Sequence, residues 1–141
     1  MAALTSRAVE EAKITKRVQV LPLDITKDPL PRGFDLVLIS NVLHGQGARE
    51  NRALLRSAYC SLNRGGRIVL RDVLMNRART DPEWGALFSV ALLLHTPHGR
   101  CYALDEVRGW LRGAGYAAIK GPFRSSPLVF DPDSMLIAEK R

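Results

Sequence analysis

The stretch from Asp35 to Gly47, DLVLISNVLHGQG, joins an apolar run to a short polar segment. The run from Phe34 to Ser40 predicts a strand that is apolar on both faces, as the central strands of parallel sheets are. Ser40, Asn41 and His44 follow immediately, ahead of two glycines. Ligands of open α/β sheets bind at the carboxyl ends of the strands. These polar residues are therefore candidates for a site.

The sequence on either side predicts strands alternating with helices. The expected strands are Val18–Leu23, Phe34–Ser40, Arg67–Leu74, Ala117–Lys120 and Ser134–Glu139, and the expected helices are Thr5–Lys16, Arg49–Leu62, Pro82–His95 and Leu104–Ala114. This alternation is typical of an α/β domain with a mostly parallel sheet and helices on both faces. No internal repeat, low-complexity tract or linker divides the chain, so residues 1–141 are expected to form a single domain.

Composition and cysteine content narrow the class of protein. The 141 residues are 46% hydrophobic, which is enough for a core and argues against disorder. The two cysteines, Cys60 and Cys101, form no disulfide framework and favour a reduced, cytoplasmic setting. No apolar run approaches the roughly 18 residues of a membrane span. Charges throughout residues 1–16 also argue against a signal peptide or anchor.

The net charge of +7 is unevenly distributed, with eight arginines against two acidic residues between positions 49 and 79. Arg49, Arg52 and Arg56 fall on one face of a predicted helix, and such a stripe can contact phosphates. A solvated helix face explains the same pattern. Because no nucleic-acid-binding motif accompanies the arginines, we favour the solvated face and do not expect a nucleic-acid partner.

His44 and Asp72 are the residues whose chemistry best fits catalysis. An unperturbed imidazole pKa near 6.5 suits a general base, and Asp72, at the end of the next strand, could orient that imidazole. Both residues also have structural explanations, since polar side chains often end strands. The spacing of His44, His95, His98 and Cys101 does not predict a metal site. The sequence contains no G-x-S-x-G, G-x-G-x-x-G or phosphate-loop motif.

The order of several sequence blocks resembles one family. The blocks are RVQVLPLDITKDPLPRGFDLVLISNVLHG, LNRGGRIVLRDVLM, HTPHGR, LDEVRGWLRGAGY and SMLIAEK. They are similar to the carboxyl-terminal catalytic domain of S-adenosylmethionine-dependent O-methyltransferases of the small-molecule type, such as hydroxyindole, caffeate and polyketide methyltransferases. The resemblance covers about Arg17 to Lys140. It implies a truncated Rossmann-like methyltransferase sheet and S-adenosylmethionine as cofactor.

The resemblance also implies roles for residues of a cofactor pocket. Asp24 matches the acidic residue that binds the adenine amino group, and Ile25 lies beside it against the ring. Ser40 and Asn41 match the segment that lines the cofactor pocket.

A second group of residues matches the catalytic and acceptor side. His44 matches the histidine that takes the proton from the acceptor hydroxyl, and Asp72 matches an acidic residue that flanks it. Phe88, Leu92 and Thr96 match the wall against which a flat small-molecule acceptor packs.

The chain departs from the family pattern at several positions. Gly45 and Gln46 stand where the family has aspartate and tryptophan, and Cys101 replaces a second flanking acid. The glycine-rich cofactor loop and the amino-terminal dimerisation domain have no counterpart in the sequence. We therefore expect an O-methyltransferase or a fragment of one. The alternative is a catalytically inactive remnant that acts as an interaction protein or as one subunit of a split enzyme.

The departures also predict open sheet edges, because the strand Val18–Leu23 lacks its family neighbours. Unpaired edges invite association with another chain. We expect a homo-oligomer that covers these edges, or a rearranged sheet in which Val18–Leu23 pairs directly with Phe34–Ser40.

Overall fold

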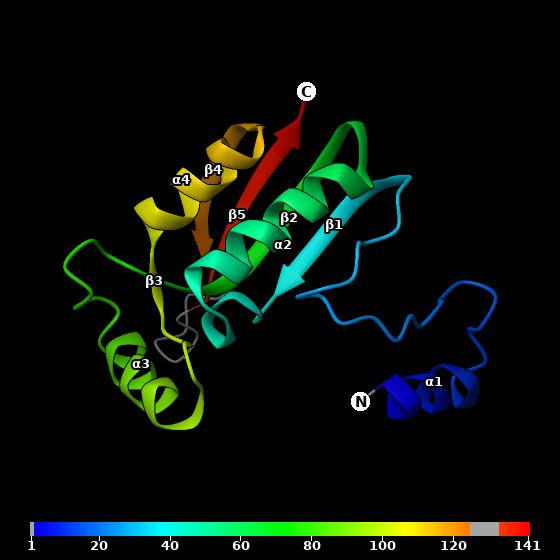
Figure 1. The fold of residues 1–141 in the computed structure, drawn as a ribbon, viewed down its shortest axis with the longest axis horizontal. Helices are drawn as coiled ribbons and strands as arrows, with labels where there is room; N and C mark the ends of the chain where they lie inside the picture. The colour runs from blue at the N-terminus through cyan, green and yellow to red at the C-terminus, as the bar shows by residue number, and fades with distance from the viewer. Residues whose placement is uncertain (1, 125–132) are drawn as a thin grey trace.

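The centre of the fold is a parallel pair of strands, β1 (Phe34–Ser40) and β2 (Leu62–Met75). A computed structural model describes residues 2–124 and 133–141 (Figure 1). A short 3-10 turn, η1 (Leu43–Gly45), and helix α2 (Ala48–Ser61) connect β1 to β2. A parallel pair needs such a crossover, which usually contains a helix. The predicted α/β class is confirmed.

The rest of the sheet is antiparallel. Its order is β1-β2-β5-β4, and β5 (Asp133–Lys140) runs antiparallel to both β2 and β4 (Tyr116–Arg124). The two-residue β3 (Tyr102–Ala103) pairs in parallel with the end of β2. The expectation of a mostly parallel sheet is therefore wrong, and the sheet is mixed. The reason is the short connection between β4 and β5, since a parallel crossover needs about a dozen residues or more.

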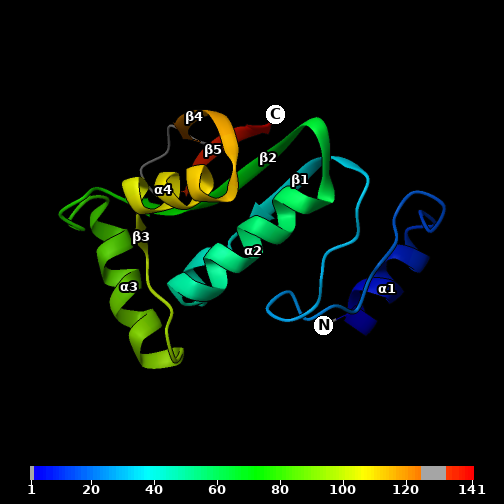
Figure 2. The same cartoon turned by 45° about the horizontal axis from the view of Figure 1, so that its top comes forward.

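Helices α2 and α4 (Leu104–Ala114) cover one face of this sheet (Figures 1 and 2). The main core lies between them and the strands, and its fully buried members include Leu55, Ile68, Leu111 and Leu136. On the opposite face, Leu36 and Leu38 of β1 are 58% and 60% exposed. At the carboxyl end of β2 the same face is covered by helix α3 (Glu83–His95), because Val73 and Met75 form a second buried cluster with Leu92 of that helix. The expectation of helices on both faces is therefore confirmed, and the second face is open only at β1.

The predicted strand Val18–Leu23 does not form. Helix α1 (Ala2–Glu11) ends earlier than expected and has no buried residue, and the segment from residue 12 to residue 33 contains turns and bends but no strand. Pairing of this segment with β1 is also wrong, because β2 is the partner of β1 among the described strands. The physical reason is the lack of a neighbour, since an unpaired strand gains no ladder hydrogen bonds and its backbone groups remain with water.

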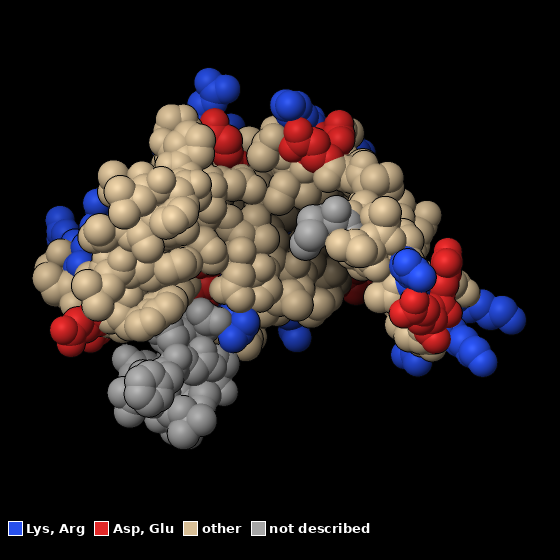
Figure 3. All heavy atoms as spheres, turned by 90° about the horizontal axis from the view of Figure 1, so that it is seen from below, with Lys and Arg blue, Asp and Glu red and all other residues tan. Residues whose placement is uncertain are grey.

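The other expected elements are confirmed, although β2 begins five residues earlier than expected and β4 ends four residues later. Helix α3 (Glu83–His95) follows the carboxyl end of β2, and only Gly85 and Leu92 on it are buried. Phe88 is half-buried, and the other large apolar residues of the helix are exposed: Trp84, Leu87, Val90, Leu93 and Leu94. Figure 3 shows a broad uncharged surface on the side of the molecule where α3 lies. Among the described residues, no helix has the length and apolar character needed to span a membrane.

Candidate active site

The chain leaves β1 through a left-handed residue, which directs it toward β2. Asn41 has φ 55°, a conformation that asparagine tolerates better than most residues. Its backbone N–H donates to the carbonyl of Arg71 at 2.8 Å, so the turn remains attached to β2. The following η1 buries Leu43 and places His44 beside Asp72. Sequence and local geometry thus bring two predicted catalytic residues together.

Asp72 is a buried carboxylate, 2% exposed, with hydrogen bonds to both of its oxygens. Oδ1 lies 2.7 Å from His44 Nδ1 and accepts the backbone N–H of Val73 at 2.8 Å. Oδ2 accepts the backbone N–H of Leu43 at 2.9 Å. Since a carboxylate only accepts, the proton of a neutral His44 lies on Nδ1 and the lone pair lies on Nε2. This is the arrangement of a histidine base with an orienting acid.

An aromatic wall from α3 borders His44. The ring of Phe88 meets the imidazole edge-on at a centroid distance of 5.0 Å, and Trp84 stacks on Phe88 at 4.9 Å. Leu92 is buried beside Cys101 in a small apolar cluster. The predicted acceptor residues Phe88 and Leu92 therefore belong to the same region as His44.

The loop after α3 also packs against the histidine. The Thr96 hydroxyl donates to the carbonyl of Leu92 at 2.8 Å and accepts the N–H of Gly99 at 2.7 Å. A Cβ on Gly99 would lie 2.6 Å from the carbonyl oxygen of His44, which shows how closely this loop approaches. Thr96 thus shapes the loop that covers the backbone of His44.

The four residues predicted for the cofactor lie in two places. Ser40 and Asn41 are at the carboxyl end of β1, where Ser40 pairs with the residue before Asp72. Asp24 is in an exposed turn, where its carboxylate accepts the Thr26 N–H at 3.0 Å and the Thr26 hydroxyl at 2.6 Å. These bonds lower the pKa of Asp24. Its partners are thus in its own turn and not at the His44 site.

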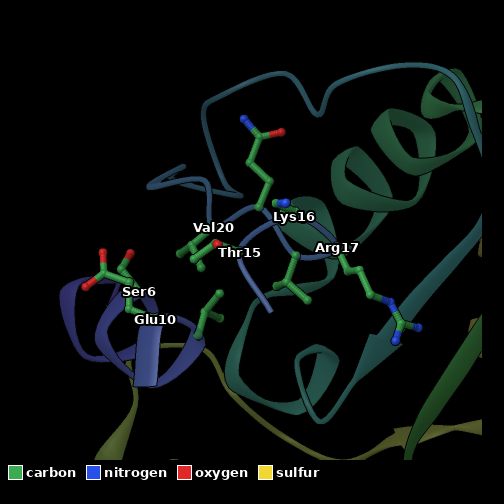
Figure 4. A pocket seen from close by; sticks show the side chains of 9 residues that line it. Ser6, Glu10, Thr15, Lys16, Arg17 and Val20 are labelled. Carbon is green, nitrogen blue, oxygen red and sulfur yellow. The ribbon is translucent and has the colours of Figure 1, made fainter. Parts of the chain in front are cut away.

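Ile25 borders an apolar hollow of about 400 Å³ beside β1. Leu36 and Leu38 line the same hollow, together with Leu21 and Leu23 of the coil segment. A larger hollow, of about 590 Å³, lies between α1 and residues 15–20 (Figure 4). Its lining includes none of the predicted site residues.

Two buried polar residues of the site were not predicted from the sequence. Asn51 of α2 is 0% exposed and its amide donates to the carbonyls of Leu43 at 2.9 Å and Gln46 at 3.4 Å. The Tyr102 hydroxyl also donates to the Gln46 carbonyl. A sequence signal for Asn51 exists, because a polar residue occupies the apolar stripe of a helix, three and four positions before Leu54 and Leu55.

Cys101 is buried beside Asp72 and its thiol is neutral near pH 7. Burial raises its pKa to about 11, and the negative charge of Asp72 adds to the effect. The residue therefore cannot replace an ionised carboxylate next to His44.

The arginine stripe lies on the solvent side of α2. Arg49, Arg52 and Arg56 are exposed, and Arg49 pairs with Glu50 at 3.6 Å. Within residues 2–124 and 133–141, no group of three histidine, cysteine or acidic residues is arranged to hold a metal ion.

Comparison with known proteins identifies the class. The model of the O-methyltransferase domain family matches residues 2–117, and the chain belongs to this family. The 3-hydroxy-5-methyl-1-naphthoate 3-O-methyltransferase of Streptomyces sahachiroi is 34% identical over 89% of this chain and 36% of its own length. The S-adenosyl-L-methionine-dependent methyl transferase PigF of Serratia sp. is 31% identical over 89% of this chain and 35% of its own length.

A solved structure gives the same result for the fold. The O-methyltransferase family 2 protein from Planctomyces limnophilus, in complex with apigenin, superposes with a TM-score of 0.85 and 32% identity. The match covers 99% of this chain and 40% of that protein. The chain thus spans little more than a third of the length of these relatives, and the resemblance stated from the sequence blocks is confirmed.

Replacing Asp72 with asparagine tests the buried carboxylate. Because both oxygens accept N–H groups, the NH₂ of Asp72→Asn must face a donor, and we expect a loss of about 1–3 kcal/mol in the free energy of unfolding. Urea denaturation measures this loss. The control is Asp35→Asn, at an exposed residue that accepts one hydrogen bond from Asn63, where a change within about 0.5 kcal/mol is expected. Equal losses in the two variants would contradict the role of Asp72.

Thiol labelling tests the burial of Cys101. At pH 8 the raised pKa keeps Cys101 protonated, so a thiol-specific reagent should modify only the exposed Cys60 in the folded chain. Both thiols should react in urea, and Cys60→Ser should leave no rapidly reacting thiol in the native state. Native reactivity of Cys101 should rise only as the pH approaches 11. Two rapidly reacting thiols at pH 8 would show that the pocket beside Asp72 is open.

Proposed function

We propose that the chain acts as an S-adenosylmethionine-dependent O-methyltransferase that methylates a hydroxyl of a small aromatic or polyketide-like acceptor. The observation that carries this proposal is the His44–Asp72 pair, 2.7 Å apart, at the carboxyl ends of β1 and β2. Support for an aromatic acceptor comes from the naphthoate methyltransferase and from the relative bound to apigenin. Phe88 and Trp84 present the matching flat surface beside the histidine.

The chemistry of this chain in the proposed reaction is that of a base. His44 accepts the acceptor hydroxyl proton at Nε2 as the oxygen becomes a nucleophile. Asp72 stabilises the resulting imidazolium through Nδ1 and prevents the ring from turning. General base catalysis of this kind contributes roughly 10²–10⁴-fold, and positioning of the acceptor on the α3 wall contributes further.

The proposed cofactor is S-adenosylmethionine, which supplies an electrophilic methyl group on sulfur when bound. Support comes from the family and from the named activity of the Serratia relative. From the family resemblance we assign Asp24 to the adenine amino group, Ile25 to the face of the adenine ring, and Ser40 and Asn41 to the lining of the cofactor pocket. Ile25 borders the apolar hollow beside β1, and the lining of this hollow does not include the other three assigned residues.

An inactive scaffold is the second candidate function. Cys101, which stands where the family has an acid, is a neutral thiol and cannot act as a second ionised group beside His44. On this alternative the fold serves as an interaction protein or as one subunit of a split enzyme. Cofactor binding by the isolated chain separates the two candidates.

Calorimetric titration of S-adenosylmethionine into the purified chain, with S-adenosylhomocysteine in parallel, is the test. The methyltransferase proposal expects micromolar binding of both compounds. His44→Ala should then keep cofactor binding and lose roughly 10²–10⁴-fold in transfer to an aromatic hydroxyl. The matched control is His95→Ala, at an exposed histidine of α3 whose ring contacts the Ala91 carbonyl. Absence of binding at millimolar cofactor contradicts the proposal and favours the scaffold.

We also propose that the protein is a cytoplasmic homo-oligomer. Both cysteines are free thiols, which suits a reducing compartment. At the β1 edge, Phe34, Leu36 and Leu38 are exposed, and an apolar strand without an outer neighbour tends to pair with another chain. A second copy that covers this edge and the open face beside it would remove these side chains from water.

Light scattering after gel filtration tests the oligomer. The wild-type chain should elute as a dimer or larger species, and Leu38→Lys should shift it to monomer, because a lysine ammonium at a buried contact is costly. Leu94→Lys introduces the same charge at an exposed position on α3 and should leave the oligomer unchanged. A wild-type monomer at high protein concentration would refute the proposal.

A further inference from the structure

The turn that carries His44 is held from three different elements. From β2, Asp72 accepts the N–H of Leu43 and contacts the His44 ring. From α2, Asn51 donates to the carbonyl of Leu43. From β3, Tyr102 donates to the carbonyl of Gln46. Both ends of the turn are therefore fixed by side chains that do not belong to it.

Asn51 has a feature that packing alone does not explain. Its side chain is fully buried and its Oδ1 atom has no hydrogen-bond partner among the described residues, although its Nδ2 donates to two carbonyls. A buried acceptor without a donor is unfavourable, and an apolar residue of similar shape would avoid it. The neighbouring buried positions of the same helix face, Leu54 and Leu55, are apolar. The two hydrogen bonds that the Asn51 amide donates to backbone carbonyls are thus the reason for a polar residue at this position.

We propose that Asn51 is a positioning residue for His44. By holding the carbonyls of Leu43 and Gln46, it fixes the turn between them, so that the Leu43 N–H and His44 Nδ1 stay directed at Asp72. This inference rests on the proposed function only in treating His44 as the general base. The geometry that it explains is independent of cofactor and acceptor.

The loss of Asn51 should alter this geometry more than the stability of the fold. The Leu43 carbonyl also accepts the backbone N–H of Gln46 at 3.2 Å, and the Gln46 carbonyl keeps the Tyr102 hydroxyl. Replacement by leucine therefore orphans neither carbonyl, and it removes the unpaired Oδ1. What disappears is the tie between the turn and α2.

Nuclear magnetic resonance of the 141-residue chain measures this tie through the exchange of the His44 Nδ1 proton with water. Asn51→Leu should accelerate the exchange roughly two- to tenfold, the factor that corresponds to one net hydrogen bond. The thermal unfolding midpoint should stay within roughly 4 °C of wild type. The matched control is Ser61→Ala, which removes a buried side-chain hydrogen bond elsewhere on α2 and should leave the exchange unchanged.

Two results would overturn the proposal: unchanged exchange in folded Asn51→Leu, or equal acceleration in Ser61→Ala. If Asn51→Leu does not fold, the wild-type chain supplies the answer. Its Asn51 amide protons should exchange more slowly than those of the exposed Asn63, and equally rapid exchange would refute the positioning role of Asn51. None of these readouts needs bound cofactor. A failure of the positioning role of Asn51 is therefore distinguishable from a failure of the methyltransferase proposal, which the calorimetric titration tests.

Discussion

The Asp72 carboxylate connects the parts of this molecule on which the site depends. It is buried at the end of β2, and its two oxygens accept the backbone N–H groups of Leu43 and Val73 and contact the His44 ring. A buried charge is tolerated only when such partners surround it. The hydrogen bonds of this one side chain thus compensate for the burial of its charge, attach η1 to the sheet and fix the tautomer of the histidine. The loop after α3 and the amide of Asn51 contact the same turn from other sides.

The same sheet is well covered at β2 and open at β1. The buried side of β2 packs against α2 and α4, and the core there contains fully buried aliphatic residues such as Ile68 and Leu111. At the other side, β1 is an edge strand with Leu36 and Leu38 exposed, although its sequence has the apolar character of a central strand. A strand of that composition at an edge is the physical basis for the proposed association with a second copy.

Much of the fold and part of the site were predictable from the sequence. Helix and strand positions between residues 34 and 116 follow from hydrophobic period, and placing His44 and Asp72 at neighbouring strand ends anticipated their contact. The prediction of a strand at Val18–Leu23 was wrong. The local pattern is adequate for a strand, but a strand also needs a paired neighbour, which the local sequence does not reveal. Asn51 was missed because its importance lies in two carbonyls that reach it only in the folded chain.

The sequence by itself determined the family, the α/β class and the residues capable of proton transfer, because these depend on residue types, their order and their local spacing. Only the tertiary structure decided the mixed direction of the sheet, the open face of β1 and the hydrogen-bond partners of Asp72. It also decided that Cys101 is a neutral, buried thiol, since its pKa of about 11 comes from burial and from a carboxylate 29 positions earlier in the chain. Such properties depend on which surfaces meet, and only the folded chain brings those surfaces together.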